Sequence, residues 1–209
     1  MGKKQRRGCS RLVYAPYTYD EETKAVTFGT VKTLAPVKSV SIEVSSESEE
    51  VWADNVLQDT VYGGTAINKT FGVTRVPADV EAELLGLSTI TAGGKTFYGT
   101  RPDGEKRPYV AIGYALHDGE ITKPCECYWA FKCIVNSISK AANTIDRGTG
   151  SEGQEVAITV SAPDVAWTAT KDKDLDIMMP VDETTTVEDI DTFFKQVVTY
   201  DNANTIFSA

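Results

Sequence analysis

Three runs of sequence between Arg107 and Pro163 decide the fold: Arg107-Pro-Tyr-Val-Ala-Ile-Gly-Tyr-Ala-Leu116, Tyr128-Trp-Ala-Phe-Lys-Cys-Ile-Val135 and Gln154-Glu-Val-Ala-Ile-Thr-Val160. β-Branched and aromatic residues fill each run, and apolar side chains recur at every second position. This pattern predicts β-strands with one buried face. Polar loops separate the runs, so we expect three strands of one sheet. None of them carries a reactive constellation, and their predicted role is to build the sheet.

Strand alternation assigns the side chains of these runs to faces. In the first run the large apolar residues share one face, namely Val110, Ile112, Tyr114 and Leu116. The opposite face carries Tyr109 and the small residues Ala111, Gly113 and Ala115, which leave room for a helix or another backbone to approach. In the second run the alternation predicts one face for Trp129, Phe131, Cys133 and Val135. The third alternates cleanly, with Val156, Ile158 and Val160 opposite Glu155, Ala157 and Thr159.

Toward the N-terminus the same patterns predict four more strands. Leu12–Thr18 and Ala25–Leu34 flank a polar tip at residues 20–24, which indicates a hairpin. Val37–Ser45 alternates, with Val40, Ile42 and Val44 on a buried face and Ser39, Ser41, Glu43 and Ser45 on a wet one. Thr65–Val76 is its expected partner strand.

Residues 46–64 mix charge with large apolar side chains and show no clear period, which predicts a long loop. Trp52, Val56, Leu57 and Tyr62 give it more apolar surface than a solvated loop needs. Such a loop either folds over an edge of the core or buries these groups in a partner.

Two helices complete the expected elements. Pro77 suits the first turn of a helix over Ala78–Leu85, with Val80, Leu84 and Leu87 on one face and Gly86 as its end. Residues 185–188 indicate a capping box. It opens a second helix with an apolar stripe that packs on the sheet or on a neighbouring subunit: Val187, Ile190, Phe194, Val197 and Val198.

The 209 residues, 41% of them hydrophobic, suffice for one large β-rich domain over residues 12–209, and no linker divides it. The formal net charge is −9, yet residues 1–11 hold five of the 21 basic side chains and no acidic one. They predict a basic arm, either solvated or ordered on assembly. The remaining body is strongly acidic, which argues against sequence-specific DNA binding.

Neither a membrane-spanning run nor the apolar core of a signal peptide is expected, and four cysteines without an export signal suggest reduced thiols in a cytoplasm. Catalytic residues, metal ligands and cofactors are not expected. His117, Cys125, Cys127 and Cys133 lack zinc spacing. Gly148-x-Gly150-x-x-Gly153 precedes a strand instead of the helix that a dinucleotide fingerprint requires. The acidic stretch 172–176 lacks the spacing of a calcium loop.

The order of these segments resembles the major tail proteins, the tail-tube subunits of long-tailed bacteriophages, of the phi13 and TP901-1-like type. Three features carry the resemblance: a helix ending Glu83-Leu-Leu-Gly86, then Arg107-Pro-Tyr-Val-Ala-Ile-Gly-Tyr114, then an aromatic strand, a polar loop and a Val-rich strand. A further segment, Glu47 through Val51-Trp-Ala-Asp-Asn55, matches a Glu…Tyr-Ala-Asp-Asn run of that family, with Trp52 in the aromatic place. The resemblance spans roughly residues 30–200.

The resemblance implies a β-sandwich or barrel of the tail-tube type, with a short central helix and a C-terminal helix. It implies a virion protein, made in the host bacterial cytoplasm, whose hexameric rings stack into a conduit for DNA during ejection. Its implied partners are other copies of the chain, the tape measure protein, and the tail terminator and distal tail proteins. The genomic DNA would pass without specific binding, and no membrane is involved. The tube of a tail-derived bacteriocin is a variant of this expectation, and a monomeric β-sandwich carbohydrate-binding module is the alternative of another class.

The tail-tube interpretation assigns roles to two sets of residues. Trp52, Leu57 and Tyr62 are the expected anchors of contacts between protomers or stacked rings. The expected channel-facing residues are Ser39, Ser41, Glu43 and Ser45, with Thr70 and Thr74 from the partner strand. The apolar face at Val40, Ile42 and Val44 would pack on the core beneath the helix at 78–85. Lys69 and Arg75 would blunt the acidic channel surface if they faced inward.

Overall fold

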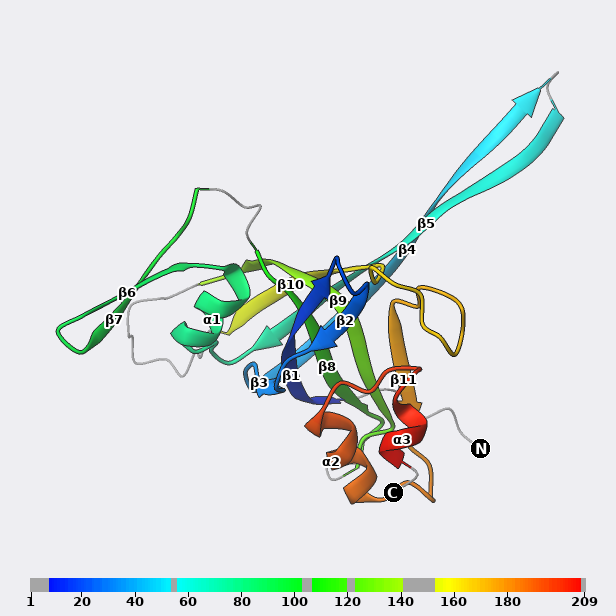
Figure 1. The fold of residues 1–209 in the computed structure, drawn as a ribbon. Coiled ribbons are helices and arrows are strands. Elements are labelled where there is room, and N and C mark those ends of the chain that lie inside the picture. The colour runs from blue at the N-terminus through cyan, green and yellow to red at the C-terminus, as the bar shows by residue number, and fades with distance from the viewer. Residues whose placement is uncertain (1–7, 54–55, 103–106, 120–122, 141–152, 208–209) are drawn as a thin grey trace, which may run out of the picture.

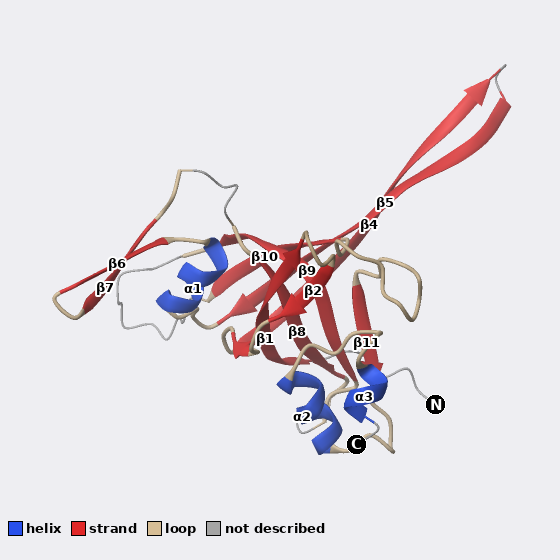
Figure 2. Cartoon of the chain, in the orientation of Figure 1, coloured by secondary structure: helices blue, strands red, loops and turns tan. Residues whose placement is uncertain are grey.

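The computed structural model describes residues 8–53, 56–102, 107–119, 123–140 and 153–207, with the backbone alone from 47 to 53 and from 56 to 64. β-Structure dominates this part of the chain (Figures 1 and 2), which confirms the β-rich prediction. The strands are β1 (Gly8–Asp20), β2 (Ala25–Phe28), β3 (Lys32–Thr33), β4 (Val37–Ala53), β5 (Val56–Val73), β6 (Ser88–Ala92), β7 (Lys95–Gly99), β8 (Tyr109–His117), β9 (Glu126–Ile138), β10 (Gln154–Ser161) and β11 (Asp176–Pro180). The helices are α1 (Ala78–Leu85), α2 (Val187–Lys195) and α3 (Ala203–Phe207).

One curled antiparallel sheet organises the molecule, in the order β2-β1-β8-β9-β10-β5-β4. Strand β11 pairs with the first half of β9, and β3 pairs with β1, while β6 and β7 form a separate two-stranded sheet. The curl brings Cα atoms of β1 and β4 within 8 Å of each other. The described residues of these two strands do not pair, so the sheet remains open between them.

Two separate cores pack against the sheet, one on each face, and the outer one contains residues of β1, β8 and β9 but none of β4, β5 or β10. The inner core of the curl contains Tyr14, Phe71, Ile112 and Tyr114, with Val80 and Leu84 of α1 packed on it. The outer core contains Trp129 and Phe131 and is covered by α2 and the C-terminal segment, through Trp167, Ile190, Phe193, Phe194, Val197 and Val198. The small residues on the second face of β8 therefore have the predicted purpose. A Cβ at Gly113 would lie 3.0 Å from the Trp129 ring, so glycine leaves room for the indole.

A β-bulge in β9 overturns one predicted face. Val110 pairs with Cys133 and Ile112 with Ala130, so three steps along β9 match two along β8. Trp129 and Phe131 consequently belong to the outer core, while Cys133 and Val135 belong to the inner one. Strict alternation would have placed all four together. The faces predicted for β8 and β10 are confirmed.

The interpretation of residues 46–64 as a loop is wrong, because β4 continues to Ala53 and β5 begins at Val56. Together they form one long hairpin whose pairing runs to Ala53 and Val56. Strand β10 pairs with β5 only between Ile67 and Val73. From Val56 to Ala66, β5 is paired with β4 alone. Figure 1 shows this outer part of the hairpin, called the ribbon below, projecting from the body at the upper right.

The N-terminal boundary also differs from the prediction. Gly8–Arg11 belong to β1, and the Arg11 side chain is 2.6 Å from the Asp191 carboxylate on α2. The basic arm as predicted, residues 1–11, thus loses its last four residues to the sheet. Residues 1–7 lie outside the described residues, and whether they order on assembly stays a prediction.

Both predicted helices are present, with one shift in capping. Helix α1 ends at Gly86, whose φ of 63° lies in the left-handed region that glycine tolerates best. Helix α2 has its capping box one residue later than predicted, with Thr186 as N-cap and Asp189 as its reciprocal partner. Ile190, Phe194, Val197 and Val198 of the predicted stripe are buried, whereas Val187 is exposed. Phe193, which the stripe did not include, is buried as well.

Candidate functional site

Five of the six residues predicted to face a channel share one face of β4 and β5. Pairing sets Ser39 opposite Gly72, Ser41 opposite Thr70, and Glu43 opposite Asn68. Ser39, Ser41, Glu43 and Ser45 are all exposed, and Thr70 is half-buried. Thr74 lies just beyond β5, exposed, and its N–H donates to the Pro36 carbonyl. A Cβ at residue 72 would lie 2.3 Å from the Ser39 hydroxyl, so glycine allows that hydroxyl to lie across the strand.

This polar face extends beyond the two strands on which it was predicted. Thr70 and Asn68 pair with Ala157 and Thr159 of β10. The Asn136 amide donates to the Thr159 hydroxyl at 2.8 Å, and that hydroxyl donates to the Asn68 side-chain oxygen at 2.7 Å. Three strands are thereby linked by side-chain hydrogen bonds. The polar half of the β10 alternation was the signal for Thr159, and Asn136 had none because it was assigned to a loop.

We call this surface the polar face and define it by its exposed and half-buried members: Ser39, Ser41, Glu43, Ser45, Asn68, Thr70, Asn136, Glu155, Ala157 and Thr159. Two of these residues carry charge, and both are carboxylates, Glu43 and Glu155. The others are small or neutral. A phosphate backbone would meet repulsion and weak hydrogen-bonding groups at these residues.

Lys69 does not blunt the polar face. Its side chain points to the opposite, inner face, is 1% exposed, and pairs with Asp176 of β11 at 3.2 Å. The ammonium also lies 5.0 Å from the centre of the Tyr114 ring, where a cation is favourable. Arg75 lies beyond the end of β5 and is exposed.

The apolar face of β4 corrects another prediction. Val40 does pack against the inner core that α1 covers. Ile42 and Val44, however, are 39% and 62% exposed. They lie opposite Lys69 and Ile67 on β5, at an edge strand whose far side has no partner among the described residues. The expected burial beneath α1 therefore stops at Val40.

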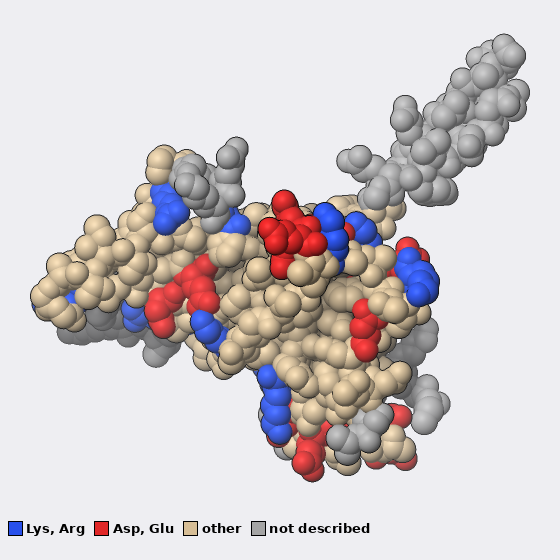
Figure 3. Space-filling view, viewed as in Figure 1, with Lys and Arg blue, Asp and Glu red and all other residues tan. Residues whose placement is uncertain are grey.

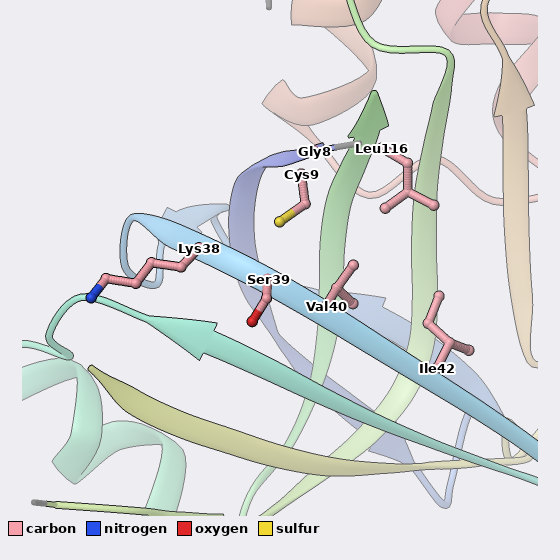
Figure 4. Close-up of a pocket in the computed structure, with 7 residues that line it drawn as sticks. All are labelled: Gly8, Cys9, Lys38, Ser39, Val40, Ile42 and Leu116. Carbon is pink, nitrogen blue, oxygen red and sulfur yellow. The ribbon is translucent and has the colours of Figure 1, made fainter. Parts of the chain in front are cut away.

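A groove marks the place where the sheet stays open. It has a volume of about 410 Å³ and is lined by Gly8, Cys9, Lys38, Ser39, Val40, Ile42 and Leu116. In Figure 4 the side chains of Cys9, Val40 and Leu116 point into the space between β1, β8 and β4, while Lys38 and Ser39 point away. Burial raises the pKa of the Cys9 thiol. The lining mixes apolar and polar groups and comes from three strands, β1, β4 and β8.

The three predicted anchors lie on the ribbon. Backbone pairing sets Trp52 opposite Leu57 and Tyr62 opposite Ser48. Their side chains fall outside the described residues, so their contacts stay a prediction. The backbone already shows that these positions belong to a two-stranded extension of the sheet.

The cysteines and the histidine lie in surroundings that suit a structural role. Burial raises the pKa of the Cys127 and Cys133 thiols to about 12, so both remain protonated at neutral pH and are poor nucleophiles. Within the described ranges, no three His, Cys, Asp or Glu side chains gather as a metal site requires. The His117 ring nitrogen Nε2 lies 2.7 Å from the Ser10 hydroxyl, a contact between β8 and β1 that a separation of 107 residues hid from sequence reasoning.

None of the helices in the described part of the chain is long and apolar enough to cross a membrane.

Comparisons with known proteins give likenesses of structure alone. No protein-family model and no curated protein sequence matches the chain. A solved structure of the tube terminating cap of the anti-feeding prophage is similar, with 10% identity and a TM-score of 0.44 over 82% of this chain and 89% of that one. A chain of the sheath–tube complex of PVC, an extracellular contractile injection system, has 16% identity and a TM-score of 0.42 over 82% and 90%.

Proposed function

We propose that this chain is the structural subunit of a phage-type tail tube, which assembles into stacked rings around a channel for DNA. The observation that carries the proposal is the ribbon. Residues 56–66 of β5 pair with β4 alone, and at a rise of ~3.3 Å per residue this segment reaches about 35 Å from the third strand. A lone two-stranded ribbon is marginally stable in water, so it needs a second molecule to cover it.

The open sheet points to self-association of the same kind. β4 is an edge strand with unpaired backbone groups along its outer side among the described residues, and Ile42 and Val44 are exposed beside that edge. Isolated proteins protect such edges, because they template pairing with other chains. Rings of subunits would satisfy the edge by closing the sheets of all copies into one barrel.

The polar face supports the channel role. It gathers hydroxyls, amides and two carboxylates over the four adjacent strands β9, β10, β5 and β4, on the side of the sheet away from Lys69. Lining a channel with this surface would let a polyanion slide without being held. The resemblance to major tail proteins, noted on independent grounds of sequence, implies the hexameric ring, the virion location and the tape measure, terminator and distal tail partners that we include in the proposal.

Microscopy of the purified chain tests this function directly. Negative staining should reveal tubes with a regular axial repeat, and light scattering during size-exclusion chromatography should show species far above the 22.7 kDa of one chain. A uniform monomer at every concentration, with no tubes, would reject the tube and favour a binding module. Native particles that contain the tube but no DNA would identify the assembly as the tube of a tail-derived bacteriocin.

A further inference from the structure

The β6–β7 hairpin carries an apolar pair that the described residues leave uncovered. Ile90 and Phe97 pair directly across the hairpin and are 68% and 56% exposed. Neither belongs to the inner or the outer core. The hairpin is a two-stranded sheet separate from the main one, and Figure 1 shows it projecting at the left of the molecule. A small sheet with an exposed aromatic–aliphatic pair indicates a docking element.

A second uncovered patch lies elsewhere on the molecule. Ile42 and Val44 share one face of β4 near the base of the ribbon and are 39% and 62% exposed. In Figure 1 the β6–β7 hairpin and the β4–β5 ribbon extend from opposite ends of the body. One chain therefore cannot bring its own two patches together, whereas two copies can.

The stretches of sequence that carry the two patches have net charges of opposite sign. Residues 88–101, which hold the hairpin, include Lys95 and Arg101 and no acidic residue. Residues 38–69 include six acidic residues and two basic ones, Lys38 and the buried Lys69. Figure 3 shows the hairpin as a mostly uncharged projection. A hairpin of this composition is attracted to the acidic β4–β5 segment of another copy, and such attraction orients docking.

We propose that the β6–β7 hairpin of one copy docks on β4 of the next, with Ile90 and Phe97 packed against Ile42 and Val44. This inference rests on the proposed function, since it names the contact by which the subunits would join. The two surfaces are different, so the contact is head-to-tail: the first copy keeps a free β4 and the second copy keeps a free hairpin. Repetition of such a contact generates a closed ring when the rotation between copies closes.

Cysteine pairing between two differently labelled chains tests the contact. One chain carries Phe97→Cys and the other Val44→Cys, both in a background with Cys9→Ser and Cys125→Ser, which removes the two half-buried native thiols. Oxidation of the mixed assembly should join unlike chains, and each chain oxidised by itself should stay uncrosslinked. Assemblies that form but give no mixed dimers, or hairpin-to-hairpin dimers from the Phe97→Cys chain alone, overturn the proposal.

A second test compares two variants that keep all native cysteines and place a glutamate on opposite faces of the hairpin. Phe97→Glu buries a carboxylate in the contact and should lower the pelletable fraction about tenfold or more. Thr91→Glu, on the opposite face of the same hairpin and exposed, should assemble like the wild type. Circular dichroism confirms that both variants fold. Equal assembly of the two variants rejects this contact while leaving the tube intact, whereas a wild-type chain that never assembles rejects the proposed function itself.

Discussion

Lys69 places a cation inside the apolar core, 1% exposed and held by one carboxylate, Asp176, at 3.2 Å. Sequence reasoning could not find this, because Lys69 occupies an apolar position in the alternation of β5 and its partner is 107 residues away. A buried charge that loses its partner is costly, since no water replaces the lost interaction.

Asp176→Asn should therefore lower the free energy of unfolding by about 1–3 kcal/mol, because it leaves Lys69 without its counter-charge. Lys69→Met should cost less, because the substitution removes the buried charge and keeps the apolar stem. Urea denaturation measures both. The exposed pair Arg11–Asp191 at 2.6 Å supplies the control, since Asp191→Asn should cost about 1 kcal/mol or less. Equal losses in Asp176→Asn and Asp191→Asn would contradict a buried role for Lys69.

Asp182 gives a pH dependence of known sign. Hydrogen bonds from the hydroxyls and backbone N–H groups of Thr184 and Thr185 to one carboxylate oxygen lower the pKa of Asp182 from 3.8 to about 2. A carboxyl whose folded pKa is lowered stabilises the fold fully above the unfolded value, and this contribution is lost as the pH falls through about 2.

The urea midpoints of the wild type and Asp182→Asn should accordingly differ most above a pH of about 4 and converge toward a pH of about 2. Denaturation at a series of pH values measures the difference, which isolates Asp182 from the other carboxylates. A gap that widens toward acid would contradict the assignment.

Elements were predictable wherever local pattern decided them. The β8 and β10 alternation, helix α1 with its Gly86 end, and the β1–β2 hairpin all follow from residue types that the structure uses as expected. The failures have physical causes. The bulge in β9 inserts a residue that no pattern announces, and it moves Trp129 and Phe131 to the other face. The ribbon was hidden because residues 46–64 show no clear period in the sequence, so no local pattern indicated that both strands continue.

The part of the polar face on β4 was predictable from local pattern, and the part that depends on strand pairing was not. Val37–Ser45 alternates, so Ser39, Ser41 and Glu43 could be assigned to one face from sequence alone. Asn68 and Asn136 could not, because only strand pairing brings them to the Thr159 hydroxyl. The edge position of β4, which exposes Ile42 and Val44, depends on long-range topology and was likewise out of reach.

A variant with a shortened ribbon tests whether the ribbon is needed for assembly and not for folding. Glu49 and Val61 pair directly, so replacing residues 50–60 by Asn-Gly closes the hairpin with a two-residue turn that suits twisted strands. The pairing of β5 with β10 begins at Ile67 and is untouched. We expect the thermal unfolding midpoint to stay within a few degrees, while tubes are no longer seen by negative staining.

The matched control replaces only residues 54–55, by Asn-Gly, which keeps Trp52, Leu57 and Tyr62 in the chain. It should assemble. Normal tubes from the shortened ribbon would show that the ribbon has another role, and an unfolded product would show that it belongs to the core of the fold.

The whole molecule combines an open curled sheet, two projecting hairpins and an acidic body. Each of these features is unfavourable for an isolated protein. Open strand edges pair with strands of other proteins, exposed apolar patches promote aggregation, and like charges repel one another. In a ring of copies these features would support the proposed function. Neighbouring copies would cover the strand edges and the apolar patches, and the acidic surface would face the DNA in the channel.

Glu43→Lys should preserve assembly and convert a tube that ignores DNA into one that holds it. Glu43 is exposed on the polar face, opposite Asn68 and away from the core, so the substitution should leave folding unchanged. In a ring the new cation repeats in every copy, and a layer of cations lining a channel would bind phosphate by releasing counterions. Binding of DNA should weaken steeply as the salt concentration rises, because the screening length shortens to about 10 Å at 0.1 M.

The retention of short fluorescent DNA by purified tubes measures this binding. The control of equal charge is Glu188→Lys, at an exposed residue of α2. If both variants retain DNA equally, the tube merely gained positive charge and the polar face does not line the channel; if only Glu43→Lys does, and low salt is required, the polar face is the surface that the DNA meets.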